Sequence, residues 1–199
     1  EKALEIDSSL VEVRNNLGVT LQELGRLDEA EASLAQAIAL KPDYAEAQSN
    51  LGVTYRKLGR LDEAVASYKK VIALRPDFAN AHYSLGNTLR ELGRLDEAKA
   101  SYLQAIKLKS DYVEAHINLG VTLRKLGRSD EALTSYRQVV ALKPNYATAH
   151  FNLGNTLRES GLLDEAEASY KQAASLRPDY AEIHSNLGVT LQELERLDE

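Results

Sequence analysis

The chain contains no cysteine, which excludes disulfide bonds, thiolate metal sites and cysteine catalysis but does not settle the cellular compartment. No apolar run approaches the roughly 18 residues that a membrane-spanning helix needs, so we expect no membrane partner. The sequence has no Asn-x-Ser/Thr sequon, and no charged and then apolar leader opens it. We therefore expect no targeting signal, and the cytoplasm is the default location.

An excess of positive charge is also lacking, since the net charge is −6. Nucleic-acid binding depends on clustered positive charge, so we expect neither DNA nor RNA as the main partner. Hydrophobic residues make up 44% and charged residues 27% of the 199 residues. This composition is typical of a folded, soluble protein and not of a disordered one.

A 34-residue period organises the whole sequence. One glycine series consists of Gly18, Gly52, Gly86, Gly120, Gly154 and Gly188. A second series lies seven residues later and consists of Gly25, Gly59, Gly93, Gly127 and Gly161. Leucine and alanine series share the period, and the only prolines, Pro42, Pro76, Pro144 and Pro178, fall on the same grid. Chance does not align five such series, so the chain is an array of repeats.

The period fixes the repeat boundaries once Val11 is taken as repeat position 1. Five full repeats then cover residues 11–44, 45–78, 79–112, 113–146 and 147–180. Residues 1–10 are interpreted as the end of a preceding repeat, and residues 181–199 as a partial sixth repeat. We predict a single array over residues 1–199.

Each repeat is predicted to contain two helices. The segment Asp43–Glu46 has the pattern of a capping box and predicts the start of the first helix, a role that Ser9 is expected to share. This helix is predicted to end near a glycine such as Gly59, because glycine suits a left-handed terminus. Asp62 is then expected to cap the second helix, which stops before Pro76.

These features resemble the tetratricopeptide repeat, whose pattern in the second repeat is carried by Gln48, Leu51, Gly52, Tyr55, Ala64, Tyr68, Val71 and Pro76. The resemblance covers the whole chain, with Ser110 in place of one proline, Glu195 in place of one glycine and Leu34 in place of one aromatic residue. It implies an all-α fold, an α-solenoid of antiparallel helix pairs in a right-handed superhelix. The first helix of each repeat would line the concave side.

Residues with reactive side chains follow the same period. The four histidines, His82, His116, His150 and His184, share repeat position 4. Equivalent atoms in successive repeats lie on the order of 10 Å apart, whereas zinc ligands lie roughly 2 Å from the metal. Asp–Glu pairs recur in every repeat and are better explained as helix caps. We therefore expect no catalytic residue, no cofactor, no metal site and no enzymatic activity.

Asparagines mark one face of the predicted first helices. Position 6 holds asparagine in five repeats, and two further asparagines lie one turn later; the set is Asn16, Asn50, Asn87, Asn118, Asn152, Asn155 and Asn186. A side-chain amide can pair with both the N–H and the C=O of an extended peptide. The row is similar to the asparagine ladder in the tetratricopeptide arm of O-linked N-acetylglucosamine transferases. The alternative is that these amides bond to neighbouring helices or to water.

Two further positions belong to the candidate groove. Position 12 supplies Arg56, Arg90, Arg124 and Arg158, and position 5 supplies Tyr83, Ile117 and Phe151. The arginines suggest an acidic ligand, but glutamates on the same face favour a salt-bridged surface. The three apolar residues are candidate anchors for a ligand, and the alternative is that they pack against the adjacent helix.

The sequence thus predicts a scaffold that binds a protein or an extended peptide, with the ligand centred on repeats three to five. Two alternatives are a substrate-recruiting arm of a larger enzyme, such as a glycosyltransferase, and a self-assembling array. Head-to-tail association is expected because Leu187 and Leu191 lose cover at one end, and Leu4 and Ile6 are expected to be exposed at the other.

Overall fold

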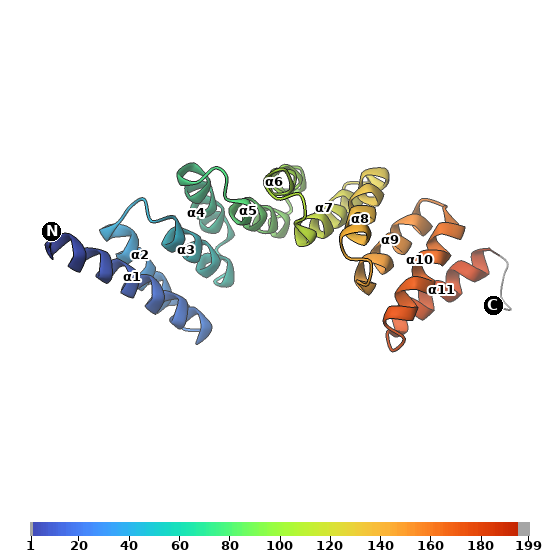
Figure 1. Cartoon of the computed structure of the whole chain (residues 1–199), viewed down its shortest axis with the longest axis horizontal. Helices are drawn as coiled ribbons and strands as arrows, with labels where there is room; N and C mark the ends of the chain where they lie inside the picture. The colour runs from blue at the N-terminus through green and yellow to red at the C-terminus, as the bar shows by residue number, and fades with distance from the viewer. Residues whose placement is uncertain (1, 195–199) are drawn as a thin grey trace. The chain divides into compact units, whose positions relative to one another are not determined.

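The computed structural model describes residues 2–194, and their side chains from residue 9 onward. In this part of the chain there are eleven α-helices and no strand (Figure 1). The helices are α1 (Lys2–Glu23), α2 (Leu27–Leu40), α3 (Ala45–Lys57), α4 (Leu61–Leu74), α5 (Ala79–Glu91), α6 (Leu95–Leu108), α7 (Val113–Lys125), α8 (Ser129–Leu142), α9 (Ala147–Glu159), α10 (Leu163–Leu176) and α11 (Ala181–Glu193). The predicted all-α repeat fold is confirmed. None of the described helices has both the length and the apolar character that a bilayer crossing requires.

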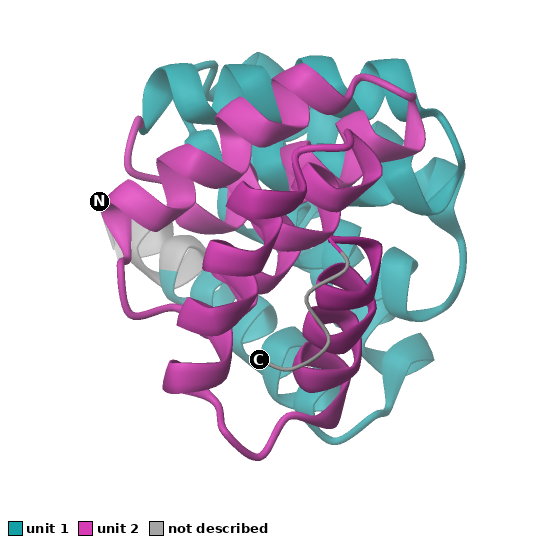
Figure 2. Cartoon of the chain, turned by 90° about the vertical axis from the view of Figure 1, so that its right-hand side faces the viewer, with its two compact units in different colours: residues 1–109 teal, residues 110–199 magenta. Residues whose placement is uncertain are grey.

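The helices divide between two compact units, which Figure 2 distinguishes by colour. Unit 1 covers residues 1–109 and holds α1 to α6; unit 2 covers residues 110–199 and holds α7 to α11. Within unit 1 the two helices of each repeat pack together, and α2 and α4 also pack on the first helix of the next repeat. Within unit 2, α8 packs on α9 and α10 packs on α11 in the same way.

The turn between the two helices of a repeat has the predicted glycine terminus. Gly59 has a φ of +75°, and its N–H donates to the carbonyl of Arg56 at 3.1 Å. The next N–H, of Arg60, donates to the carbonyl of Tyr55 at 2.9 Å. These two bonds define a Schellman motif, which satisfies carbonyls that the helix end leaves open.

The other glycine series lets the paired helices approach closely. A Cβ atom on Gly52 would lie 2.8 Å from Cε1 of Tyr68, and one on Gly120 would lie 2.7 Å from Cε1 of Tyr136. Both rings are almost completely buried and lie at the centre of their repeats. A glycine on one helix thus makes room for a tyrosine on the other.

The predicted side-chain caps are wrong. Helix α3 has Tyr44 as its N-cap residue, without a capping side-chain bond, and α4 has Arg60 in the same role. The Tyr44 N–H donates instead to the carbonyl of Lys41 at 3.1 Å, so a backbone turn leads into the helix. Asp62 lies inside the first turn of α4, where a carboxylate still interacts favourably with the helix dipole.

Helix α1 differs from the prediction for the start of the chain. It runs from Lys2 to Glu23 without a break, so Ser9 caps no helix. Residue 8 is serine where the grid has proline, and its N–H allows the helix to continue. At the other end Leu191 is buried and Leu187 half-buried. The predicted exposure of Leu4 and Ile6 lies outside the residues whose side chains are described.

Candidate functional site

The predicted groove residues lie on the first helices of the repeats. In unit 1 they belong to α1, α3 and α5, and in unit 2 to α7, α9 and α11. Positions 5, 9 and 12 follow at helical spacing, which places their side chains along one face. The environment of each side chain within its unit shows which of these residues are already used in packing or in hydrogen bonds.

In unit 1 the asparagines join neighbouring repeats. The side-chain N–H of Asn50 donates to Oδ1 of Asn15 at 2.9 Å, and Asn15 donates in turn to Oδ1 of Asn16 at 3.4 Å. Asn16 is exposed and Asn50 is half-buried. The bond of Asn50 therefore agrees with the alternative that these amides bond to neighbouring helices, whereas the Asn16 side chain is exposed to solvent.

Asn87 and Asn155 accept hydrogen bonds from buried tyrosines. The Tyr102 hydroxyl donates to Oδ1 of Asn87 at 2.8 Å, and the Tyr170 hydroxyl donates to Oδ1 of Asn155 at 2.6 Å. In unit 2 Oδ1 of Asn155 also receives the side-chain N–H of Asn186 at 2.8 Å. The oxygens of Asn87 and Asn155 are thus used inside the protein, as the structural alternative proposed.

The remaining position 6 amides of unit 2 reach the surface. Asn118, Asn152 and Asn186 are all half-buried and recur once per repeat on α7, α9 and α11. A side-chain amide has two N–H donors and an oxygen that accepts two bonds. One bond within the protein, such as that of Asn186, therefore leaves capacity for a ligand.

The apolar residues at position 5 have unequal exposure. Phe151 is only 7% exposed, and its ring centroid lies 6.1 Å from that of Tyr170 and 5.7 Å from that of Tyr180. Ile117 is half-buried and packs on the cluster of Val113, Val139 and Ala149. The Phe151 side chain is therefore used in packing within the protein, whereas Ile117 keeps some accessible surface.

Tyr83 is the aromatic position 5 residue of unit 1, and it is half-buried. Its ring centroid lies 6.1 Å from that of Tyr102, in a tilted arrangement that suits two aromatic side chains. Tyr83 therefore combines a supported ring with an accessible surface, which is what an anchor residue requires.

Three of the four arginines at position 12 form ion pairs with the next repeat. Arg56 lies 3.4 Å from Glu91 in unit 1, and in unit 2 Arg158 lies 3.3 Å from Glu193. Arg124 binds Glu159 through two bonds, one of which joins Nε to Oε2 at 3.0 Å. The prediction of a salt-bridged face is confirmed at these arginines.

Burial changes the acidity of the central tyrosines. It raises the pKa of Tyr102 and of Tyr136 to about 12, because the phenolate loses its hydration; the neighbouring Arg90 and Arg124 guanidinium groups partly oppose the shift. These hydroxyls therefore remain hydrogen-bond donors at neutral pH.

Among the described residues the Tyr136 hydroxyl finds no acceptor. Residue 121 is valine, whereas Asn87 and Asn155 stand at the same repeat position and accept a bond from their tyrosines.

The sequence interpretation missed the role of Gln22. Its side-chain N–H donates to the carbonyl of Asn50 at 2.6 Å and also binds the hydroxyl of Thr54. Gln22 occupies position 12, where four later repeats have arginine. The glutamine in place of arginine was the signal available in the sequence. The shorter Gln22 side chain bonds to the backbone of the neighbouring repeat, whereas arginines at this position bind a glutamate.

The histidines have a structural role. Nε2 of His82 lies 3.0 Å from the carbonyl oxygen of Pro76, and the same contact joins His116 to Ser110, His150 to Pro144 and His184 to Pro178. A carbonyl only accepts, so Nε2 carries the hydrogen in each contact. Among the described residues no three His, Cys, Asp or Glu side chains gather in a way that could hold a metal ion.

Comparisons with known families find the repeat over residues 21–199. The family described as "TPR repeat" matches residues 21–59, 54–89 and 86–127, and the family "Tetratricopeptide repeat" matches residues 117–181 and 151–199. No curated protein matches the chain in sequence.

Solved structures are similar over most of their length. The crystal structure of MamA is 27% identical, with a TM-score of 0.77 over 83% of this chain and 96% of MamA. TTC0263, a thermophilic TPR protein from Thermus thermophilus, is 26% identical, with a TM-score of 0.62 over 92% of this chain and 99% of its own. YrrB, described as a TPR protein with an unusual peptide-binding site, is 24% identical, with a TM-score of 0.77 over 92% of this chain and 95% of YrrB.

Proposed function

The chain belongs to the tetratricopeptide repeat family, and we propose that it acts by binding an extended segment of a partner protein rather than by catalysis. The observation that carries this proposal is the row of half-buried amides in unit 2, formed by Asn118, Asn152 and Asn186. Each amide pairs with the backbone of the bound segment, so recognition depends little on the sequence of the partner.

The charges on this face support backbone recognition. The guanidinium groups of Arg124 and Arg158 are already paired with Glu159 and Glu193. An acidic ligand would have to displace these glutamates, so charge contributes little to its selection. Uncharged backbone groups have no such glutamate to displace, and each amide has more hydrogen-bonding groups than one internal bond uses.

The spacing of the repeats suits an extended chain. Packed helices lie about 8–10 Å apart, and an extended chain advances about 3.3 Å per residue. One amide per repeat therefore meets about every third residue of the ligand. In unit 2 Ile117 supplies an accessible apolar contact beside Asn118. The similarity to YrrB, a TPR protein with an unusual peptide-binding site, supports a peptide as the class of ligand.

The test uses peptides selected from a random displayed library on the immobilised chain and then synthesised. Calorimetric titration compares the wild-type chain with the triple variant N118A/N152A/N186A. One hydrogen bond is worth about 1 kcal/mol net, so three together should weaken binding roughly 100-fold. The matched control N80A/N145A removes two asparagines that lie off the amide row, and it should bind as the wild type does.

Circular dichroism must show equal helix content in the three proteins, so that a loss of affinity reports on the amides alone. Equal affinity of the triple variant and the control would contradict the proposal and leave these asparagines as structural residues.

A further inference from the structure

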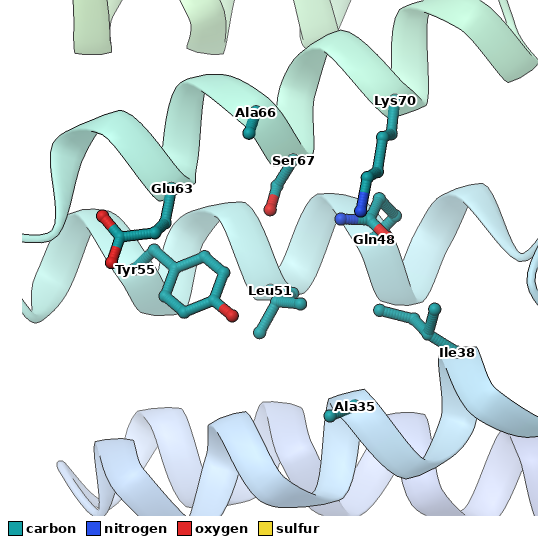
Figure 3. A pocket seen from close by; sticks show the side chains of 9 residues that line it. All are labelled: Ala35, Ile38, Gln48, Leu51, Tyr55, Glu63, Ala66, Ser67 and Lys70. Carbon is teal, nitrogen blue, oxygen red and sulfur yellow. The ribbon is translucent and has the colours of Figure 1, made fainter.

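Unit 1 contains a pocket of about 290 Å³ between the second helices α2 and α4, with α3 as its floor (Figure 3). The asparagine row uses first helices only, so this pocket is a separate feature. Four of its lining residues, Ala35, Gln48, Tyr55 and Lys70, differ from the residues that most other repeats place at the same positions. A residue type that recurs in every repeat is best explained by the repeat scaffold. Four residues that differ from the repeat pattern and line one pocket indicate instead a role specific to that pocket.

Gln48 is the first departure. It is 3% exposed and occupies the position at which four repeats have a histidine bonded to a backbone carbonyl. The Gln48 amide has no hydrogen-bond partner among the described residues and lines the pocket instead. The amide faces the open pocket, so a ligand can pair with it without breaking a bond within the protein.

Two more donors lie beside this amide. Lys70 has no ion-pair partner among the described residues, and the other repeats have glutamine at its position. Ser67 also faces the pocket, whereas its counterpart Ser33 donates to the carbonyl of Arg14 at 2.8 Å. In Figure 3 the Lys70 amine and the Gln48 amide lie together at one end of the pocket. This end suits a carboxylate.

The opposite end is held in place by an ion-pair network. The guanidinium of Arg60 lies 4.5 Å from the ring centroid of Tyr55 and binds both Glu31, at 2.7 Å, and Glu63, at 2.9 Å. The Tyr55 ring therefore forms a fixed wall. Two carboxylates share one guanidinium there, so this end repels an acidic group.

The middle of the pocket is apolar. Ile38 and Leu51 line it, and the short side chain of Ala35 leaves room beside them, where the other full repeats have longer residues at this position. Those longer side chains are Lys69, Leu103, Arg137 and Lys171. The open space suits an aliphatic side chain of a ligand.

We propose that this pocket binds an extended segment of a partner protein in which an aliphatic residue is followed, two positions later, by an acidic residue. The aliphatic side chain lies over Leu51 beside Ala66, and the carboxylate reaches Lys70 and Gln48. Ala66 and Lys70 are four residues apart on α4, which is about 6 Å at 1.5 Å per residue. Side chains two positions apart on an extended chain lie on one face, about 6.6 Å from each other.

The probe is the blocked peptide acetyl-Gly-Leu-Ser-Glu-Gly-amide, whose only carboxylate is the glutamate side chain. Titration into the isotope-labelled full chain, followed by amide chemical shifts, should give weak binding, in the millimolar range, with shifts confined to the pocket residues of α2, α3 and α4. Replacing the glutamate of the peptide by glutamine, or the leucine by serine, should weaken binding at least tenfold.

Variants that restore the periodic residue test the pocket without endangering the fold, because each new residue is accommodated at the same position elsewhere in the array. Ala35→Lys should abolish binding by filling the apolar space, and Lys70→Gln should weaken it about tenfold. The matched control Gln172→Lys places a lysine at the corresponding position of α10 and should bind as the wild type does.

Absence of binding at the highest soluble peptide concentration would overturn this inference. So would affinity that Ala35→Lys leaves unchanged, or shifts that map onto the asparagine row. The pocket does not depend on the proposed function of that row, and the N118A/N152A/N186A variant should bind this peptide normally. The two proposals can therefore fail separately.

Discussion

Val121 and Asn155 occupy the same position in successive repeats. Asn155 provides a hydrogen-bond acceptor for the buried tyrosine of its repeat, whereas Val121 provides none. The Tyr170 hydroxyl donates to Asn155 at 2.6 Å, whereas the Tyr136 hydroxyl has no acceptor among the described residues. We predict that Asn155→Val destabilises unit 2 and that Val121→Asn stabilises it.

The magnitudes follow from what each change does to a buried hydroxyl. Asn155→Val leaves the fully buried Tyr170 hydroxyl without this acceptor, which costs about 1–3 kcal/mol. The change also removes the 2.8 Å hydrogen bond that Asn186 donates to Asn155. Val121→Asn gives Tyr136 an acceptor and should gain about 0.5–1.5 kcal/mol. Valine and asparagine have similar helix propensities, so the backbone contributes little to either value.

Urea denaturation followed by circular dichroism measures the change, and amide hydrogen exchange in α7 to α10 locates it. Local exchange is needed because repeat arrays need not unfold in one step. Loss of stability on Val121→Asn, or no loss on Asn155→Val, would refute the pairing of this position with the buried tyrosine. The double variant should come closer to the wild type than Asn155→Val does.

Three further predictions concern packing, pH and surface charge. Gly120→Ala should lower the free energy of unfolding, measured by urea denaturation, by about 1–3 kcal/mol, because its Cβ would lie 2.7 Å from the Tyr136 ring. Gly188→Ala has nothing within 4 Å of the new Cβ, so it should be neutral or stabilising by up to about 1 kcal/mol. Burial raises the pKa of Tyr102 and Tyr136 to about 12, above the value of about 10 in an unfolded chain, so their contribution to stability is complete below pH about 10 and is lost as the pH rises through about 12. Phenolate absorbance should show these two tyrosines ionising after the exposed ones; ionisation of all ten near pH 10 in the folded state would contradict the burial argument. Glu159→Gln removes the partner of Arg124 on a partly exposed surface and should cost less than about 1 kcal/mol, an effect that added salt should reduce further; a larger, salt-independent loss would show that the pair is more than a surface contact.

The local structure was largely predictable from the sequence, because it depends on residues close together in the chain. Gly59 ends α3 in a left-handed conformation and Pro76 follows the end of α4, as the pattern predicted. The capping residues were misidentified because the turns before α3, α5, α9 and α11 close through backbone bonds, which leave no distinctive side chain in the sequence. The right-handed superhelix and head-to-tail association remain predictions.

The candidate site was less predictable than the fold. Helical spacing placed the asparagines on one face but did not separate Asn155, whose oxygen is used by Tyr170, from Asn152, whose amide is half-buried at the surface. Phe151 resembled an exposed anchor in the sequence, yet its ring packs between Tyr170 and Tyr180. Neither distinction can be read from the sequence of α9 alone, because the partners Tyr170 and Tyr180 lie outside that helix.

The sequence by itself determined the period and the two helices of each repeat, since both follow from short-range spacing. The tertiary structure alone decided which polar groups are already satisfied, and it brought Ala35, Gln48, Tyr55 and Lys70 together in one pocket. Hydrogen-bond satisfaction and exposure depend on how separate helices pack, both within a repeat and between repeats. A 34-residue pattern repeats the residue types without specifying which of their atoms come into contact.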